Sequence, residues 1–263
     1  MFRKFMEITR KWIPLPIRQL MFRIGLYFAP DSSRVFLPVN VEFGTTESIM
    51  YCLAQRGFNP KLAIDVGAYR GEWTQSLKKY YPACGVLMVE ANEEFNSVLL
   101  ACSKSLGESV TYQIALLGAK DGEIVPFCVM ETGSSVYEER SPYQRVKVNK
   151  STTTLDSLIN TEDQVDFIKL DVQGYELEIL RGGARCLNQA QVIQIEASLI
   201  PTNAGCPLIS EVMAFMNDAG FQLFDFCTFL RRKDGALWQV DLIFLNKHSN
   251  MIPSVSLTQE NWH

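Results

Sequence analysis

The sequence predicts an α/β fold, in which helices separate the strands of a mostly parallel sheet. From residue 61 onward, short apolar runs alternate with amphipathic segments, a pattern typical of strands and crossover helices. The last two apolar runs are separated only by a turn at Asp234-Gly235, so the sheet should end in an antiparallel pair. The length of 263 residues, with 47% hydrophobic and 21% charged side chains, suits one soluble α/β domain.

Each element follows from its local pattern. Strands are expected at about residues 61–66, 85–90, 110–117, 124–130, 165–170, 192–196, 221–226 and 237–245, and helices at about 72–80, 93–105, 174–181 and 207–219. Gly182 and Gly220 follow the last two helices, as expected for a residue that tolerates the left-handed conformation at a helix end. Asp121-Gly122 predicts a hairpin between the third and fourth strands. The polar stretch 131–153 shows no period and is expected to be an irregular lid or substrate loop.

Charge divides the chain into regions: a basic, apolar helical arm or lid over 1–45, the α/β domain over 46–250 and a tail over 251–263. Residues 1–34 contain seven basic and two acidic side chains, a net +5, which leaves −9 for the remainder of a chain of net charge −4. Basic residues interleaved with bulky apolar ones suit a helix on an anionic membrane surface. The favoured alternative is an arm that packs on the body or caps the pocket. Pro14 and Pro16 limit the segment to at most two short helices.

Several functional classes are disfavoured by composition. Both histidines, His248 and His263, lie near the C-terminus, which argues against a Ser-His-Asp relay or a zinc site built from histidine. The seven cysteines form no CxxC pair and are odd in number, as expected for reduced thiols. Without a membrane-spanning run or a secretory signal pattern, a cytoplasmic location is expected, with peripheral contact to the inner face of the membrane as an option for residues 1–34. The acidic body has no basic stripe for nucleic acid.

The first chemical motif is the turn Asp65-Val-Gly-Ala-Tyr-Arg-Gly71, between a predicted strand and a predicted helix. Gly67 allows a tight turn close to a ligand, and Gly71 lets the helix begin close to it. Because the spacing is not GxGxxG, a loop around an adenosyl or amino-acid moiety is favoured over a diphosphate cradle. Glu90 ends the next strand, where a carboxylate can accept both hydroxyls of a ribose. Together they favour a cofactor that contains adenosine.

A second group of polar residues ends two later strands. Lys169 and Asp171 are two positions apart, so both should project from one face at the edge where open α/β sheets bind ligands. Glu176 falls in the first turn of the next helix, where a carboxylate also suits the helix dipole. Glu196 ends the following strand and should stand beside Asp171 if the strands are neighbours. Two adjacent carboxylates either raise one pKa, making a base, or hold a divalent cation, and either could activate a hydroxyl group.

These motifs resemble the FkbM family of S-adenosylmethionine-dependent methyltransferases over about residues 60–246. The similar segments are the Asp65 turn with Gly71 and Thr74, Val-Glu90-Ala-Asn92, Thr154-Leu-Asp156, Ile168-Lys-Leu-Asp-Val-Gln-Gly-Tyr-Glu176, Ile195-Glu-Ala-Ser198, Gly220-Phe221 and Gln239-Val-Asp241. The resemblance implies a class I methyltransferase (Rossmann-like) fold, with a seven-stranded, mostly parallel sheet whose last strand is antiparallel. It also implies O-methyl transfer, since known relatives act mainly on hydroxyls of sugars, glycolipids and polyketide-type natural products.

The resemblance assigns Asp65, Gly67 and Ala68 to the methionine end of S-adenosylmethionine and Glu90 to its ribose. The whole expected cofactor site comprises Asp65, Gly67, Ala68, Tyr69, Gly71, Thr74, Glu90, Ala91, Asn92 and Asp171. Three positions depart from the family pattern: Tyr69 stands where asparagine is common, Ala91 where proline is common, and Gln173 replaces a frequent glutamate. The last departure weakens any metal site that needs a carboxylate there.

The resulting hypothesis is methyl transfer by in-line displacement to a hydroxyl of a sugar, glycoconjugate or natural product. Asp171, aided by Lys169 or Glu196, would orient and deprotonate that hydroxyl, and Asp171 and Glu196 would be the ligands of any divalent metal. Two alternatives remain open: a Rossmann-type oxidoreductase, disfavoured by the missing GxGxxG, and an inactive cofactor-fold protein that binds at a membrane surface. No sequence feature indicates an oligomeric state.

Overall fold

The structure, a computed structural model, describes residues 42, 44–130, 133–138, 140 and 145–252. Almost all of the expected N-terminal arm and C-terminal tail, and part of the expected loop 131–153, lie outside the described residues. The described helices include none that is long and apolar enough to cross a bilayer. All seven cysteines are free, and six of them are buried.

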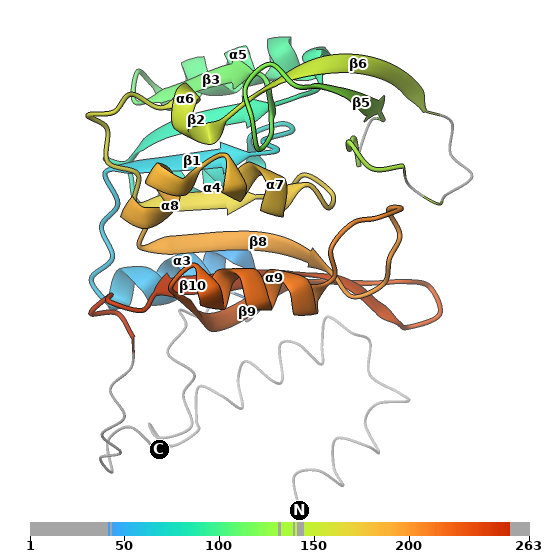
Figure 1. The fold of residues 1–263 in the computed structure, drawn as a ribbon. Helices are drawn as coiled ribbons and strands as arrows, with labels where there is room; N and C mark the ends of the chain where they lie inside the picture. Colours follow the sequence, from blue (N-terminus) through green and yellow to red (C-terminus); the bar gives the residue numbers. More distant parts are fainter. Residues whose placement is uncertain (1–41, 43, 131–132, 139, 141–144, 253–263) are drawn as a thin grey trace, which may run out of the picture. The chain divides into compact units, whose positions relative to one another are not determined.

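A seven-stranded sheet forms the centre of the fold (Figure 1). Its strands, in order across the sheet, are β3 (Val110–Ile114), β2 (Gly85–Glu90), β1 (Leu62–Val66), β7 (Phe167–Leu170), β8 (Val192–Ser198), β10 (Leu237–Asn246) and β9 (Phe221–Arg231). Among the described strands of this sheet, only β10 runs opposite to the others. The expected fold class is therefore confirmed. Every residue of β7 and β8 is buried, because helices cover both faces of the sheet at these central strands.

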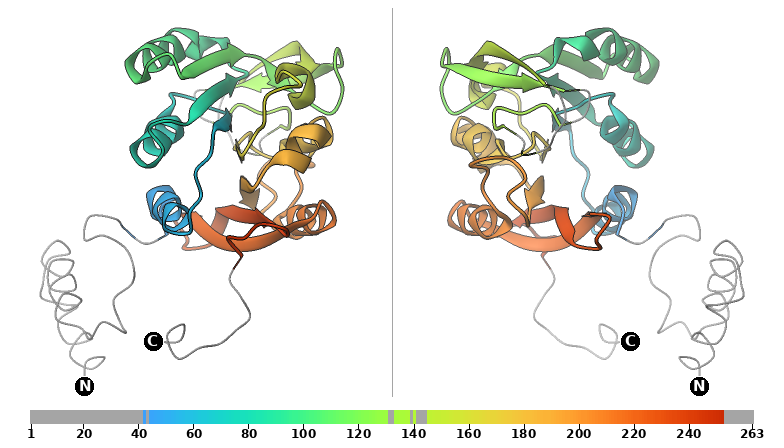
Figure 2. Two further views of the ribbon diagram at one scale, coloured as in Figure 1. Left: turned by 90° about the vertical axis from the view of Figure 1, so that its left-hand side faces the viewer. Right: turned by 90° about the vertical axis from the view of Figure 1, so that its right-hand side faces the viewer.

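Two groups of helices cover the two faces (Figure 2). One group consists of α3 (Thr46–Gln55), α4 (Glu72–Tyr80) and α5 (Asn96–Leu106), preceded by the short 3-10 helix η2 (Glu93–Phe95), and the other of α7 (Glu176–Arg181), α8 (Ala184–Gln189) and α9 (Ile209–Asp218). Each group has its own apolar core, centred on Leu53 and Leu77 on one side and on Leu180 and Met216 on the other. Helices α3 and α8, like the single turn α6 (Leu155–Leu158), were not predicted.

A second, three-stranded sheet corrects the prediction for residues 110–153. Its order is β4 (Leu116–Leu117), β6 (Val146–Thr153) and β5 (Ile124–Val129). The single strand predicted at 110–117 is wrong, because β3 and β4 belong to different sheets. The predicted hairpin is also wrong, since β5 pairs antiparallel with β6 rather than with the strand before it.

The prediction of an irregular loop over 131–153 is wrong for its second half, which is the strand β6. Only Thr152 in this strand is buried, and Val146 and Val148 are its only apolar residues, so the segment lacks the apolar run by which a strand is recognised. The strand forms because β4 and β5 supply backbone partners on both sides, which a local pattern does not reveal.

Candidate active site

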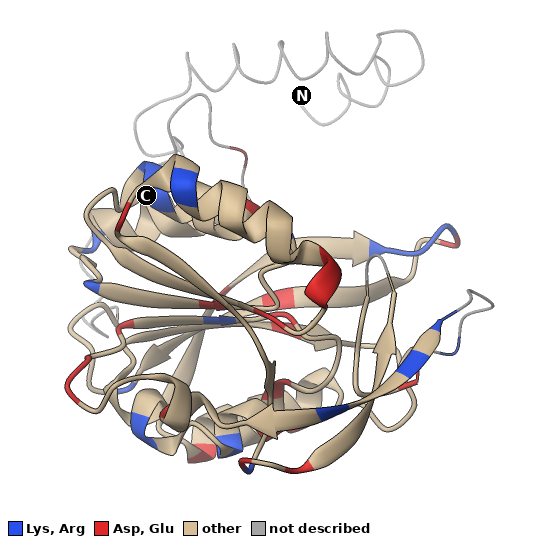
Figure 3. Ribbon diagram, turned by 90° about the horizontal axis from the view of Figure 1, so that it is seen from above, with Lys and Arg blue, Asp and Glu red and all other residues tan. Residues whose placement is uncertain are grey.

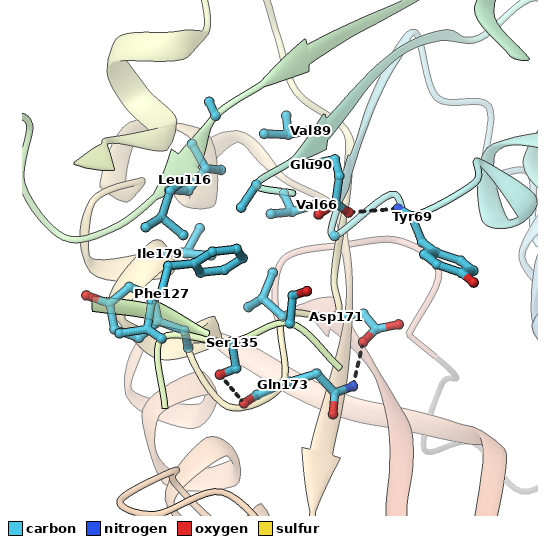
Figure 4. A pocket seen from close by; sticks show the side chains of 18 of the residues that line it. Val66, Tyr69, Val89, Glu90, Leu116, Phe127, Ser135, Asp171, Gln173 and Ile179 are labelled. Atoms are coloured by element: carbon cyan, nitrogen blue, oxygen red, sulfur yellow. Dashed lines mark hydrogen bonds between the residues drawn. The ribbon is translucent and has the colours of Figure 1, made fainter. Parts of the chain in front are cut away.

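A pocket opens at the C-terminal ends of β1, β2 and β7, and the second sheet forms one of its walls (Figure 4). The described residues around it are Val66, Gly67, Tyr69, Val89, Glu90, Ala91, Phe95, Ala115, Leu116, Leu117, Phe127, Gly133, Ser134, Ser135, Val136, Asp171, Val172, Gln173, Tyr175 and Ile179. This is the edge at which open α/β sheets bind their ligands.

Two backbone groups hold the carboxylate of Glu90 at the end of β2. Oε2 accepts the N–H of Tyr69 at 2.9 Å, and Oε1 accepts the N–H of Asn92 at 2.8 Å. Glu90 is 8% exposed, and burial raises its pKa although both N–H bonds act in the opposite direction. Each carboxylate oxygen has a further lone pair, so Glu90 can accept hydrogen bonds from two vicinal hydroxyls.

The turn after β1 passes directly over the chain that leaves β7. Gly67 has a φ of +71°, and a Cβ at this position would lie 1.9 Å from the carbonyl oxygen of Asp171. The N–H groups of Gly67 and Ala68 both donate to the carbonyl of Val89, at 2.9 and 3.1 Å. Glycine is therefore required at position 67, because any side chain there would push apart the ends of β1 and β7.

Beneath this turn, Lys169 and Asp65 form a buried ion pair. Lys169 Nζ lies 3.3 Å from Asp65 Oδ1 and 3.6 Å from Asp171 Oδ2, and it donates to the carbonyl of Gly67 at 2.8 Å. Thr74 donates its hydroxyl to Asp65 Oδ2 at 2.8 Å. Burial alone would lower the pKa of Lys169, but the nearby carboxylates of Asp65 and Asp171 raise it above its ordinary value. Lys169 thus holds the turn through the carbonyl of Gly67 and the carboxylate of Asp65.

Asp171 and Glu196 are brought together as the strand order implied, and one amide links them. Gln173 Nε2 donates to Glu196 Oε2 at 2.6 Å and to Asp171 Oδ1 at 3.2 Å. Gln239 Nε2 also donates to Glu196 Oε2, at 2.9 Å. Asp171 lines the pocket with a side chain that is 39% exposed, whereas Glu196 lies deeper and does not line it. The orientation of the Gln173 amide follows from these acceptors.

Several carboxyl groups around this link have raised pKa values. Burial raises the pKa of Glu196 well above its ordinary value, and the charges of Asp171 and Asp241 raise it further. Asp241, on the neighbouring strand β10, has a pKa raised to about 6 by burial and by Asp171. Protons can therefore be held at this end of the sheet close to neutral pH.

Glu176 supports the loop that presents Asp171 and Gln173. Its Oε1 accepts the N–H groups of Val172 and Gly174, both at 3.0 Å, and burial raises its pKa to about 7. Gln173, between these two residues, has a left-handed φ of +57°. Glu176 thus stabilises an unusual loop conformation ahead of its own helix.

The structure divides the expected site residues into two sets. Gly67, Tyr69, Glu90, Ala91 and Asp171 line the pocket. The others lie behind it: Asp65, Ala68, Gly71, Thr74, Asn92, Lys169 and Glu196. Gly71 has a packing role, since a Cβ there would lie 2.6 Å from Cys102 Sγ, and Asn92 caps η2 by accepting the N–H of Glu94.

Sequence reasoning missed the contribution of the second sheet and the loop after it. Leu116 and Phe127 form an apolar wall, and Ser135 donates its hydroxyl to the carbonyl of Gln173 at 2.9 Å (Figure 4). The only available signal was the segment Gly133-Ser-Ser135 in a stretch expected to lie near the substrate. Nothing in the local pattern placed Phe127 at the pocket, because that placement depends on the pairing of β5 with β6.

Charge and donor chemistry decide which groups the pocket can hold. The described lining residues include the carboxylates Glu90 and Asp171 and no lysine or arginine. Such a pocket suits a ribose carried by a cationic molecule, whereas an anionic diphosphate would be repelled. In the described part of the chain, no cluster of three or more His, Cys, Asp or Glu side chains is arranged to hold a metal ion.

The strand order and the single antiparallel strand among the described strands of this sheet are those of the class I methyltransferase fold. The chain belongs to the FkbM methyltransferase family, because the family's "Methyltransferase FkbM domain" matches residues 65–223, more than half of its length. No curated protein sequence matches the chain significantly.

Solved methyltransferase structures show a distant similarity. The magnesium protoporphyrin IX methyltransferase of Synechocystis PCC 6803 is 13% identical with a TM-score of 0.47, and the match covers 76% of this chain and 81% of that one. The 1,6-didemethyltoxoflavin-N1-methyltransferase of Burkholderia thailandensis is 15% identical with a TM-score of 0.44, over 76% of each chain. The precorrin-6y C5,15-methyltransferase of Geobacter metallireducens GS-15 is 15% identical with a TM-score of 0.43, over 76% of this chain and 86% of that one.

Proposed function

We propose that this protein transfers a methyl group from S-adenosylmethionine to a hydroxyl group of a sugar, glycoconjugate or natural product. The observation that carries the proposal is the pocket with Glu90 and Asp171 as its charged lining residues in the described part of the chain. S-adenosylmethionine carries a sulfonium and an ammonium group, so two carboxylates favour it electrostatically. The acceptor class rests on membership of the FkbM family.

The residues present fit this cofactor. Glu90, held by the N–H groups of Tyr69 and Asn92, would bind the ribose hydroxyls. The apolar side chains of Leu116 and Phe127 suit the flat face of an adenine. When bound, S-adenosylmethionine supplies the methyl group from an already activated sulfonium centre.

Asp171 is the group placed to take the proton from the acceptor hydroxyl. Its carboxylate is exposed to the pocket, with Oδ1 held by Gln173 and Oδ2 3.6 Å from the ammonium of Lys169. Lys169 and Gln173 therefore orient the carboxylate without blocking it. Glu196 acts through Gln173 and is a positioning residue in this scheme. Holding the hydroxyl beside the methyl donor supplies much of the acceleration, because orientation replaces a bimolecular encounter.

Two measurements test the proposal. Isothermal titration calorimetry of the wild type is expected to show binding of S-adenosylmethionine and none of NAD; binding of NAD alone would revive the oxidoreductase alternative. Labelled S-adenosylmethionine is then incubated with extracts of cells that lack the protein, and the methylated product is identified by mass analysis. If no component of any extract acquires the label although the cofactor binds tightly, the alternative of an inactive binding protein is favoured.

The Asp171→Asn variant tests whether Asp171 is the proton acceptor. It should bind the cofactor within a few-fold of wild type and lose methyl transfer by about 100-fold or more, the size expected for removal of a general base. Asp218→Asn, at the exposed end of α9, changes the same charge far from the pocket and should retain full activity. Full activity of Asp171→Asn would reject the role given to this residue.

A further inference from the structure

The hairpin formed by β9 and β10 exposes apolar side chains next to basic ones. Phe226, Phe229 and Leu230 are 39%, 48% and 38% exposed and lie within five positions of one another near the end of β9. Arg231, Arg232 and Lys233 follow directly and are exposed at the tip, where Arg232 forms an ion pair with Asp234 at 2.8 Å. We name residues 226–233 the hairpin tip.

The hairpin tip projects at the same edge of the sheet as the pocket. Among the described strands, β9 pairs with the antiparallel β10 alone, so it runs parallel to β1 and β7 and its last residue, Arg231, lies at their C-terminal end. Figures 1 and 3 show the tip reaching beyond the strand ends, with its basic residues coloured blue in Figure 3.

A second cluster of exposed basic and apolar side chains lies at this edge, on the other side of the pocket. Val146 begins β6, is 65% exposed and stands between Arg145 and Lys147, which pairs with Glu138 at 3.0 Å. It is opposite Val129 at the end of β5, the strand that supplies Phe127 to the pocket wall. The start of β6 and the hairpin tip, which extend on the same side of the fold in Figure 1, thus both carry exposed basic and apolar side chains.

The chain enters this domain at the hairpin tip. The N–H of Thr228 donates to the carbonyl of Gly44 at 3.0 Å, and the ring of Phe229 lies 3.2 Å from the position that a Cβ of Gly44 would take. The sequence before Gly44 contains the net +5 of residues 1–34 together with many bulky apolar residues. Gly44, which begins the domain, therefore contacts the hairpin tip.

From these observations we propose that the edge of the sheet that carries both the pocket and the hairpin tip binds the surface of an anionic phospholipid bilayer. Exposed phenylalanine and leucine side chains insert into the interfacial region, and adjacent arginine and lysine side chains contact anionic headgroups. The chain after residue 34 has a net charge of −9, and the hairpin tip places three exposed basic side chains next to exposed apolar ones, so charge complementarity favours this orientation. Resting on the proposed function, this orientation turns the pocket toward the bilayer and makes a hydroxyl on a lipid-linked glycan the acceptor.

Vesicle co-sedimentation of the full chain tests the proposal without any enzymatic readout. Vesicles of phosphatidylcholine containing phosphatidylglycerol should sediment the wild type, and vesicles of phosphatidylcholine alone should not. Replacing three charges in Arg231→Gln/Arg232→Gln/Lys233→Gln should weaken the partition coefficient by about tenfold or more. The matched control is Lys61→Gln/Lys104→Gln/Lys120→Gln, which removes three charges from exposed positions outside the pocket edge and should change binding little.

The apolar contribution has its own pair of variants. Phe229→Ser/Leu230→Ser should weaken vesicle binding several-fold, whereas Ile124→Ser, 64% exposed at the other end of β5, should not. Circular dichroism melting of each variant verifies that the fold is intact. The proposal is overturned if wild type does not sediment with anionic vesicles, or if both hairpin variants bind like wild type, which would leave residues 1–43 as the binding segment.

The same variants distinguish a bilayer from RNA as the binding partner. If a short RNA binds as tightly as the vesicles and only the charge variant weakens it, the edge is a polyanion surface and the bilayer proposal fails. Because none of these measurements involves S-adenosylmethionine, loss of cofactor binding would refute the proposed function and leave the bilayer proposal standing. Conversely, methyl transfer to a soluble glycan without vesicle binding would refute the bilayer proposal alone.

Discussion

Asp65 of β1 and Lys169 of β7 are paired in register across the sheet, and their side chains form an ion pair of 3.3 Å under the turn at Gly67. Both side chains are almost completely buried, and Asp65 Oδ1 accepts no hydrogen bond from the described residues. The ion pair is thus the main compensation for burying this oxygen. It couples the end of β1, which carries the turn, to the exit of β7, which carries Asp171.

Lys169→Met should destabilise the protein by about 3–5 kcal/mol, because it leaves a buried carboxylate without its cation. The free energy of unfolding is measured in urea. The double variant Lys169→Met/Asp65→Asn removes both charges and should recover part of the loss, with Thr74 still able to donate to the amide oxygen. If the double variant is as unstable as the sum of the single changes, the two residues are not coupled.

Glu90→Gln should weaken binding of S-adenosylmethionine by about 10- to 100-fold and destabilise the free protein by about 1–3 kcal/mol. The amide has one acceptor oxygen, so its NH₂ group must face the N–H of Tyr69 or of Asn92. Calorimetry measures the affinity and urea unfolding the stability. Glu94→Gln is the matched control, because this neighbouring side chain is exposed. Unchanged affinity in Glu90→Gln would remove Glu90 from the cofactor site.

Glu176 makes stability depend on pH in a defined direction. Its pKa is raised from 4.5 to about 7 in the folded protein, so folding favours the protonated form. The resulting stabilisation is fully present below pH 4.5 and is lost as the pH rises toward 7, and linkage gives it a size of about 3 kcal/mol.

The Glu176→Gln variant isolates this effect, because its amide oxygen can still accept the N–H groups of Val172 and Gly174. The unfolding free energy of wild type minus that of the variant should fall by about 3 kcal/mol across this pH range. Asp241, whose pKa is raised to about 6, titrates in both proteins and cancels in the difference. A difference that stays constant with pH contradicts the assignment.

Gln173→Glu should create a cation site. The substituted carboxylate would stand between Asp171 and Glu196, where the Gln173 amide now donates to both. Three oxygen ligands attract Ca²⁺ or Mn²⁺, so either ion should raise the melting temperature of the variant by several degrees more than that of wild type. Gln222→Glu, at an exposed position of β9, adds the same charge elsewhere and should show no such response. Equal responses in all three proteins would contradict this account of Gln173.

Some site positions were predictable because they depend on strand ends alone. Glu90 terminates an apolar run, and the C-terminal ends of parallel strands meet at one edge, so its place at the pocket followed from local pattern. The closeness of Asp171 and Glu196 followed in the same way once β7 and β8 were neighbours. The family motif placed Asp65 at the cofactor, but the structure buries it beneath the turn with Lys169, a contact between residues far apart in the chain.

The sequence by itself determined the central sheet, because runs such as β1, β7 and β8 must be buried and their periodicity records that burial. Tertiary structure alone decided that β5 pairs with β6, that Gln173 links two carboxylates and that the hairpin tip lies at the same edge of the sheet as the pocket. The physical reason is the sequence distance between interacting residues. Periodicity depends on which side chains of one segment are buried, whereas a hydrogen bond or a strand pair depends on which distant segment supplies the partner.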